Sequence, residues 1–365
     1  MILKTQNLKN DQRVLKEINS LTTNGANVEI LVARDCDLTE QELGYKLHEN
    51  KIWGGAAPKN IIIRIIGVIQ FYILSILFIK KNMKSYQGFW VCDPIMFGLV
   101  YLLKLIKKDK IIIWDHHELP PTWFMKSKFL MSLFQKSYEK TDIIIHCNAS
   151  RKFYLEEKLG YKHPKYYILN NYPKIENNYL NSNLEKSSTE WINQNPNFVY
   201  LQNCLQDDRN GAVIIKALLK KGFNIFHAGK INLDYLYKNE IQPDNKKLHL
   251  AGYLSFSQIN TVLTQCKFTV ICYKKDSLNQ IYCDANRLYQ AMSIGVGIII
   301  GDNPTMVEAT ENYENKIIIN GDGSNEDSLI KAINQISNKS ISKLPLILDW
   351  ELQDENFKEI LAIMK

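Results

Sequence analysis

Short runs of apolar, mostly β-branched residues recur along the whole chain and predict buried strands. They fall at residues 28–33, 89–92, 110–115, 142–147, 166–169, 198–201, 223–228, 248–252, 268–273, 297–300 and 316–319. Segments with helical spacing of apolar residues, such as 14–21 and 212–219, lie between them. Continuous apolar strands that alternate with helices are typical of parallel sheets covered on both faces. The pattern therefore predicts an α/β fold.

The domain organisation follows from length and from a change in the pattern. A chain of 365 residues is too long for one ordinary core. Between residues 172 and 196, Asn, Ser, Glu and Pro replace the apolar periodicity, as in a linker. We predict two doubly wound units in tandem: an N-terminal domain of residues 1–174, a C-terminal domain of residues 175–345, and a last segment, 346–365, that packs back toward the N-terminal domain.

One segment, residues 61–79, is almost wholly apolar. Arg64 and Gln70 interrupt it, and Lys80 and Lys81 follow it. Its length approaches that of a membrane span. It stands between two predicted strands of one sheet, however, where a crossover helix is required. The sequence therefore favours a packed or interfacial helix over a true span.

The charge is unevenly distributed. The net charge is +7, and residues 51–170 carry 19 Lys and Arg against 8 Asp and Glu. This bias suggests an anionic partner for the N-terminal half, such as a membrane phospholipid, a lipid-diphosphate acceptor or nucleic acid. A solvated lysine-rich face explains it equally well. Nucleic acid is the least favoured partner, because the basic stretch lacks interleaved aromatic platforms.

The spacing of the cysteines and the first residues of the chain bear on the cellular location. Seven cysteines are scattered along the chain without a CxxC pair, which indicates neither a zinc site nor a disulfide framework. Residues 1–15 lack the apolar core of a cleavable signal peptide. We expect a cytoplasmic location.

Candidate catalytic residues follow the strand at 110–115. Asp115, His117 and Glu118 lie where ligands bind in open parallel sheets. His116 and His117 are adjacent and point to opposite faces in an extended chain, which argues against a metal centre. A histidine held by a carboxylate can orient an acceptor hydroxyl or take its proton. The alternative is that the histidine only caps the following helix.

In the second half, polar residues again follow strands. Arg209 precedes a helix and can pair with diphosphate oxygens. Gly252 and Tyr253 form a turn that can read a flat base. Asn286, Arg287 and Gln290 open a helix, where amides can hold ribose and the arginine can neutralise phosphate. The sequence Asp35-Cys36-Asp37 resembles a metal-binding DxD motif but lacks a suitable context.

In order, these features resemble the GT-B group of glycosyltransferases, in particular its retaining family four. The motifs are Asp11-Gln12-Arg13-Val14, Asp115-x-His117-Glu118, Asn170-Asn171-Tyr172-Pro173, Arg209-x-Gly211, Gly252 and Trp350-Glu351. The resemblance covers nearly the whole chain. It implies two Rossmann-like domains facing a central cleft.

The resemblance also implies roles for the residues. His117 would lie beside the acceptor and the transferred sugar, with Asp115 and Glu118 in the same motif. Arg209 and Arg287 would stabilise the leaving diphosphate, and position 290 would hold the ribose. Neither a divalent metal nor another cofactor is implied. The glutamate pair of the family falls on Tyr282 and Gln290, so both carboxylates are missing here.

The sequence therefore predicts a glycosyltransferase that moves a sugar from a nucleotide-sugar donor to a glycan or lipid-linked acceptor in surface polysaccharide biosynthesis. We expect it at the inner face of the cell membrane, peripherally associated. Two rival hypotheses use the same fold: a non-catalytic partner subunit, which the missing glutamates favour, and a nucleotide-sugar epimerase.

Overall fold

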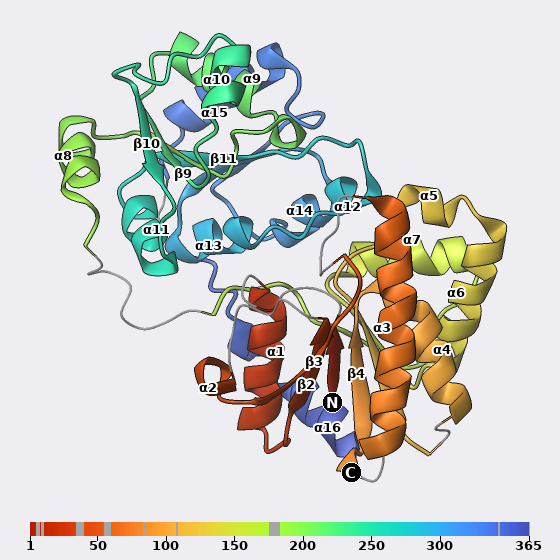
Figure 1. Cartoon of the computed structure of the whole chain (residues 1–365). Coiled ribbons are helices and arrows are strands. Elements are labelled where there is room, and N and C mark those ends of the chain that lie inside the picture. Colours follow the sequence, from red (N-terminus) through yellow and green to blue (C-terminus); the bar gives the residue numbers. More distant parts are fainter. Residues whose placement is uncertain are drawn as a thin grey trace. The chain divides into compact units, whose positions relative to one another are not determined.

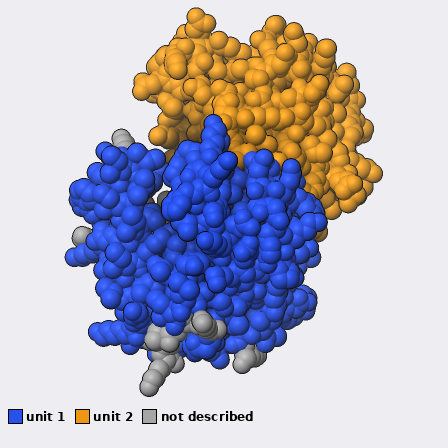
Figure 2. Space-filling model, turned by 90° about the vertical axis from the view of Figure 1, so that its right-hand side faces the viewer, with its two compact units in different colours: residues 1–171, 350–365 blue, residues 172–349 orange. Residues whose placement is uncertain are grey.

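The structure is a computed structural model that describes residues 1–4, 8, 11–33, 40–54, 60–82, 85–106, 109–174, 183–341 and 344–364. The Asp35-Cys36-Asp37 motif lies outside these residues. The chain forms two compact units, drawn in different colours in Figure 2. Unit 1 comprises residues 1–171 and 350–365, and unit 2 comprises residues 172–349. The first unit is thus built from two separate stretches of the chain.

Unit 1 is built on a seven-stranded sheet with the order β3-β2-β1-β4-β5-β6-β7, in which all neighbours are parallel (Figure 1). Its strands are β1 (Ile2–Lys4), β2 (Glu29–Ala33), β3 (Lys46–Asn50), β4 (Gly88–Cys92), β5 (Ile111–His116), β6 (Ile143–His146) and β7 (Tyr166–Ile168). Its helices are α1 (Gln12–Thr23), α2 (Glu40–Leu43), α3 (Ile61–Asn82), η2 (Pro94–Met96), α4 (Phe97–Ile106), α5 (Thr122–Met125), α6 (Lys128–Lys140), α7 (Ala149–Leu159), η5 (Trp350–Gln353) and α16 (Asp354–Met364).

Alternate residues of the central strands face opposite layers, because side chains alternate along a strand. Trp90 and Ile113 belong to a core that also contains Val14 of α1 and Phe357 of α16. On the other face, Trp114 packs against Phe134 of α6, with ring centroids 4.8 Å apart. Both faces of the sheet are therefore covered, and this explains the continuous apolar strands.

Unit 2 has a six-stranded parallel sheet with the order β10-β9-β8-β11-β12-β13. Its strands are β8 (Val199–Gln202), β9 (Ile225–Ala228), β10 (Leu248–Gly252), β11 (Phe268–Ile271), β12 (Gly297–Ile300) and β13 (Lys316–Ile318). Its helices are α8 (Lys186–Gln194), η4 (Asp207–Arg209), α9 (Gly211–Lys220), α10 (Leu233–Lys238), α11 (Phe256–Leu263), α12 (Leu278–Ile281), α13 (Asn286–Ile294), α14 (Pro304–Ala309) and α15 (Glu326–Asn338). The core lies on both faces, under α9 and α15 on one side and under α11 and α13 on the other.

The α/β prediction with two doubly wound parallel-sheet units is confirmed. Each predicted strand overlaps an observed one, and β1 and β3 are additional. The interpretation of residues 172–196 as a linker does not hold for residues 186–194. Residues 186–194 form α8, which buries Ser188 and Ile192 because its apolar positions meet unit 2.

Candidate functional site

In unit 1, charged side chains gather at the carboxyl end of three neighbouring strands. Lys4 is the last residue of β1, Asp93 directly follows β4, and Asp115 lies in β5. The register pairs Cys92 with Asp115, so these strands end at the same level. This edge of a parallel sheet is where ligands bind in doubly wound folds.

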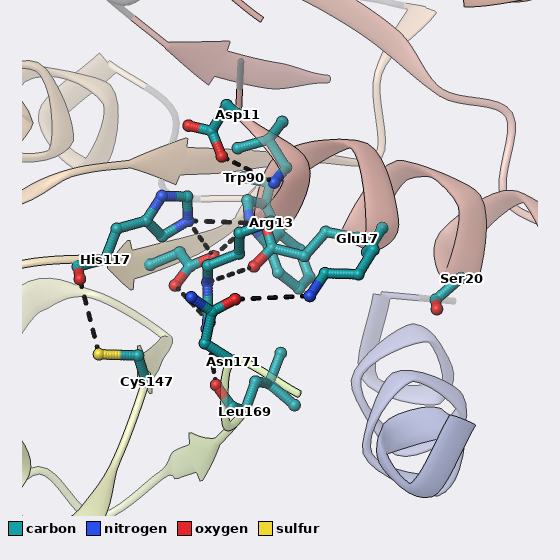
Figure 3. Close-up of polar contacts among 12 residues, drawn as sticks. Asp11, Arg13, Glu17, Ser20, Trp90, His117, Cys147, Leu169 and Asn171 are labelled. Atoms are coloured by element: carbon teal, nitrogen blue, oxygen red, sulfur yellow. Dashed lines mark hydrogen bonds and ion pairs between the residues drawn. The ribbon is translucent and has the colours of Figure 1, made fainter. Parts of the chain in front are cut away.

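His117 contacts all three of these charged side chains, and Figure 3 shows its imidazole on the side of Arg13 and Glu17 of α1. Its Nε2 donates a hydrogen bond to Oδ2 of Asp115 at 3.0 Å and lies 3.6 Å from Oε2 of Glu17. Its Nδ1 lies 3.3 Å from Nζ of Lys4 and 3.7 Å from Oδ1 of Asp93. Both ring nitrogens are therefore engaged within unit 1.

Helix α1 supplies the remaining partners. Asp11 caps its start by accepting from the backbone N–H of Val14 at 3.1 Å, and the same carboxylate meets Nζ of Lys4 at 2.6 Å. One turn on, Nε of Arg13 pairs with Oε1 of Glu17 at 2.8 Å, since residues i and i+4 share a helix face. Arg13 also reaches Asp115, with 3.4 Å between Nη2 and Oδ1. The Asp11-to-Val14 motif thus joins the candidate site to the helix that follows β1.

The electrostatics of this group favour a charged imidazole. Burial is the largest single influence and would lower the pKa of His117. The carboxylates of Asp115 and Glu17, with the hydrogen bond to Asp115, together outweigh burial and the opposing charge of Lys4, and they hold that pKa well above its usual value. Burial would likewise raise the pKa of Asp115, but His117 and Arg13 hold it well below its usual value. Burial and the nearby charge of Asp115 raise the pKa of Glu17 to about 7. His117 is therefore better suited to donate hydrogen bonds than to take a proton at neutral pH.

Four potential metal ligands also meet here. Glu17, Cys92, Asp115 and His117 each offer a ligand atom, and these atoms lie within 4.8 Å of one another. Asp115 already accepts from Trp90 and His117, and Glu17 is paired with Arg13. A divalent cation would have to displace these partners beside two fixed cations, Lys4 and Arg13. The residues as arranged fit an ion-pair network better than a metal centre.

The neighbours of His117 in sequence lie elsewhere. His116 points to the opposite face of the sheet and is buried beside Trp114, with ring centroids 4.3 Å apart. Burial lowers the pKa of His116 to about 3, so it is neutral. Glu118 is exposed. The opposite orientation of the two histidines agrees with the sequence argument.

In unit 2, two arginines meet on one aromatic ring. The guanidinium carbons of Arg287 and Arg209 lie 4.8 Å and 5.3 Å from the ring centroid of Tyr273. Each donates one hydrogen bond to a backbone carbonyl at the end of β8: Arg209 to Asn203, just after the strand, at 3.0 Å, and Arg287 to Gln202, its last residue, at 2.5 Å. Arg209 comes from η4 and Arg287 from the first turn of α13. The sheet thus holds both guanidinium groups at its carboxyl end.

Three nitrogens of these guanidinium groups are buried without a hydrogen-bond partner among the described residues. They are Nε of Arg209, and Nε and Nη2 of Arg287. None of the ion pairs within the described part of the chain involves either arginine. Buried donors without partners are costly in a folded protein. An anion placed here would satisfy them.

Close backbone approaches fix the loop that carries Arg209. A Cβ on Gly211, at the start of α9, would lie 1.7 Å from the carbonyl oxygen of Cys204. A Cβ on Gly229 would lie 1.9 Å from Oδ1 of Asn203, and Gly229 has φ of +118°. Only glycine fits at these two positions. They bring the loop after β8 against both β9 and α9.

The remaining predicted donor residues are found around this edge. Gly252 ends β10 with φ of +72°, and the side chain of Tyr253 is 77% exposed. Asn286 is exposed at the first residue of α13, and Tyr282 follows α12. Gln290 is buried, and its Nε2 donates to Oδ1 of Asn260 in α11 at 2.6 Å. In this structure the Gln290 amide therefore joins two helices.

Sequence reasoning missed several members of both groups. Lys4, Glu17 and Asp93 were not singled out in unit 1, and Tyr273 was not singled out in unit 2. Lys4, Asp93 and Tyr273 each stand at the end of a strand or within two residues of it, and that position was an available signal. Glu17 offered only its spacing of four residues from Arg13.

The sequence matches no family model and no curated protein. Solved structures are similar over the full length. The sucrose-phosphate synthase of Thermosynechococcus elongatus has a TM-score of 0.73 at 10% identity, with 100% of this chain and 98% of that chain covered. Anabaena HepE in complex with UDP has a TM-score of 0.72 at 12% identity, with 99% of each chain covered. A glycosyltransferase from Rickettsia africae has a TM-score of 0.65 at 14% identity, with 100% and 97% covered.

At these identities the likeness concerns the fold. The chain has the two-domain Rossmann-like fold of GT-B glycosyltransferases, and the predicted resemblance is confirmed at that level.

Proposed function

We propose that this protein is a glycosyltransferase that uses a nucleotide-sugar donor. The observation that carries the proposal is the pair of guanidinium groups on Tyr273, whose buried nitrogens have no partner among the described residues. Two cations held at the carboxyl end of a parallel sheet suit the diphosphate of such a donor. The full-length likeness to a protein solved with UDP supports this choice.

In the proposed reaction, the bond between the sugar and the diphosphate breaks, and the acceptor hydroxyl forms the new bond to the sugar. The acceptor proton goes to the leaving phosphate. Arg209 and Arg287 stabilise the negative charge that develops on that phosphate. Gly252 and Tyr253 contribute the surface for the base. Asn286 and Tyr282 contact the nucleotide sugar. The proposed reaction uses neither a metal nor another cofactor. The resemblance to family four implies that a hexosyl group is transferred with retention of configuration.

In unit 1, we assign His117 to the acceptor or the transferred sugar. Its raised pKa makes the imidazole a hydrogen-bond donor at neutral pH. Nδ1 is the nitrogen available to a substrate, because Nε2 is held by Asp115. Nδ1 would exchange its neighbours Lys4 and Asp93 for a substrate oxygen. We propose a glycan or lipid-linked acceptor in surface polysaccharide biosynthesis, at the cytoplasmic face of the membrane.

The test is incubation of the protein with UDP-, GDP- and CMP-sugars and lipid-linked sugar acceptors. We expect acceptor-dependent release of nucleotide with one donor, and its loss in the Arg209→Met/Arg287→Met variant. The Lys331→Met variant is the matched control, since Lys331 is an exposed residue of α15. Absence of both nucleotide binding and release with every donor would contradict the proposal.

A second candidate, a non-catalytic subunit, is favoured by one observation. The two carboxylates of the family pattern are Tyr282 and Gln290 here, and Gln290 is turned toward Asn260. Such a subunit would bind the nucleotide sugar without releasing nucleotide. An epimerase would instead interconvert a nucleotide sugar in the absence of any acceptor.

A further inference from the structure

Helix α3 is packed on one side and apolar on the other. Its buried positions Gly67, Phe71, Ser75 and Ile79 recur every four residues and face the rest of unit 1. Near the middle of the helix, Tyr72 donates a hydrogen bond to the carbonyl of Ile95, which follows β4. A crossover helix in water usually carries charged or polar residues on its outer side. In α3 the outer side is instead a second apolar stripe.

The outer stripe, defined as Ile65, Ile69, Ile73 and Leu77, recurs with the same spacing of four residues. These side chains are between 46% and 58% exposed. Ile61, Ile62 and Ile66 extend the apolar surface toward the start of the helix. Only 17% of the most apolar 18-residue stretch of this helix is buried. From Ile61 to Leu77 the helix therefore exposes an apolar surface about 25 Å long.

The neighbouring helices also expose apolar side chains. In unit 1, α3 packs beside α4, and α4 beside α6 (Figure 1). Figure 2 turns this side of unit 1 toward the viewer. Leu102 and Leu105 of α4 and Phe129 of α6 are exposed, the last at 71%. Soluble proteins rarely leave apolar patches of this extent in water.

The charge of the helices on this face of unit 1 indicates what kind of partner fits the apolar surface. Helices α3, α4, α5 and α6 carry seven Lys and Arg residues and a single acidic residue, Glu139. Lys81 continues the outer stripe after Leu77, and Lys80 lies beside it; both are exposed. A second copy of the chain would place two layers of the same positive charge against each other. An anionic bilayer matches both the apolar stripe and the positive charge.

We propose that the outer stripe of α3 lies in the surface of an anionic phospholipid bilayer, with the helix axis in the membrane plane. The packed stripe holds α3 to unit 1, so the apolar side chains enter the bilayer from one side and the helix does not cross it. Lys80 and Lys81 at its end contact lipid phosphates. This inference concerns unit 1 alone and does not depend on the proposed transfer reaction.

The test is co-sedimentation with vesicles of equal parts phosphatidylcholine and phosphatidylglycerol. We expect wild-type protein to bind, and the Ile69→Glu/Ile73→Glu variant to lose at least about tenfold in vesicle affinity. The matched control is Leu344→Glu/Ile347→Glu, because these residues are also exposed and apolar but lie in unit 2. This control should bind like wild type. Both variants should keep the wild-type circular dichroism and melting temperature, since the substituted side chains are exposed.

Two further measurements identify the source of binding. The Lys80→Gln/Lys81→Gln variant should bind the anionic vesicles several-fold more weakly, with a smaller loss in high salt. Alkaline carbonate should release the wild-type protein from membranes, because an in-plane helix is peripheral; resistance would overturn the in-plane arrangement in favour of a span. A third outcome would favour a second copy of the chain. If the wild-type protein does not bind vesicles but forms a dimer, and the Ile69→Glu/Ile73→Glu variant is a monomer, the proposal is overturned.

Discussion

Asp115 accepts a hydrogen bond from His117 at 3.0 Å, although only one residue separates them in the chain. Side chains two residues apart lie on the same face of a strand, and this places the carboxylate under the imidazole. The intervening His116 is directed into the apolar layer on the other face. A local property of the β-strand thus selects which of two adjacent histidines carries a charge.

Replacing Asp115 by Asn should expose this dependence. The variant removes the main cause that raises the pKa of His117, so that pKa should fall toward or below its usual value. It also takes from buried His117 the carboxylate that holds Nε2, and from Arg13 one of its two carboxylate partners, so we expect the free energy of unfolding to drop by about 3–5 kcal/mol. NMR titration of the imidazole and urea unfolding measure the two effects. Asp109→Asn, at an exposed residue, is the control; an unchanged His117 pKa in Asp115→Asn would refute the assigned cause.

Glu17 should make stability depend on pH. Its pKa is raised from 4.5 to about 7, so the folded state binds more protons than the unfolded state between these values. The free energy of unfolding should therefore fall as the pH rises from about 4.5 to 7. Above a pH of about 7, Glu17 should cause no further decrease. In Glu17→Gln, which cannot ionise, this part of the decline should disappear, a difference of about 1–3 kcal/mol at pH 8. Parallel stability curves for the two proteins between pH 5 and 8 would show that Glu17 is ionised throughout.

Arg209 and Arg287 should contribute separately to nucleotide affinity. Each offers unpartnered donors, and a hydrogen bond to a charged group contributes about 1.5–3 kcal/mol. Arg287→Met and Arg209→Met should each weaken binding of a nucleoside diphosphate about tenfold or more. Isothermal titration with UDP, GDP and CDP measures this, with Lys331→Met as control. An equal loss for the nucleoside, which has no phosphate, would mean that the arginines do not act on the diphosphate.

Gly211 should tolerate no side chain. A Cβ there would lie 1.7 Å from the carbonyl oxygen of Cys204, so the loop or the helix α9 would have to move. We expect Gly211→Ala to lower the free energy of unfolding of unit 2 by about 3 kcal/mol or more and to weaken nucleotide binding through Arg209. Gly160→Ala is the comparison: it has φ of +62° but open space around it, and should cost only about 1 kcal/mol. Gly211, unlike Gly160, does not have a positive φ, so a loss no larger than that of Gly160→Ala would contradict the steric conflict with Cys204.

Much of the fold could be predicted from sequence because buried parallel strands are apolar on both faces. Strands such as residues 297–300 stand out for this reason. Strand β3 did not, since Lys46, His48 and Glu49 give it a polar edge sequence, and β1 is only three residues long. Helix α8 was hidden by its polar composition, although Ile192 anchors it.

The candidate site was predictable in part. Residues in the segments that follow strands, such as His117 directly after β5 and Arg209 in η4 after β8, could be found because strand ends are where ligands bind in this architecture. The partners that set their chemistry come from distant parts of the chain, and no local pattern relates them. Lys4 meets His117 across 113 residues, and Tyr273 meets both arginines only in the folded sheet. The roles of Gly252, Tyr253, Asn286 and Gln290 toward a donor stay predictions.

The return of the chain to unit 1 bears on biosynthesis. Nε1 of Trp350 donates to Oγ of Ser20 at 2.9 Å, and Phe357 stacks on Trp90 with ring centroids 6.0 Å apart. During translation, residues 1–171 leave the ribosome long before these two aromatic side chains exist. Unit 2 can reach its native state first, while the core of unit 1 stays uncovered on the face that Trp350 and Phe357 later occupy. A chaperone that shields this face during that interval would act on the beginning of the protein, not on its newest part.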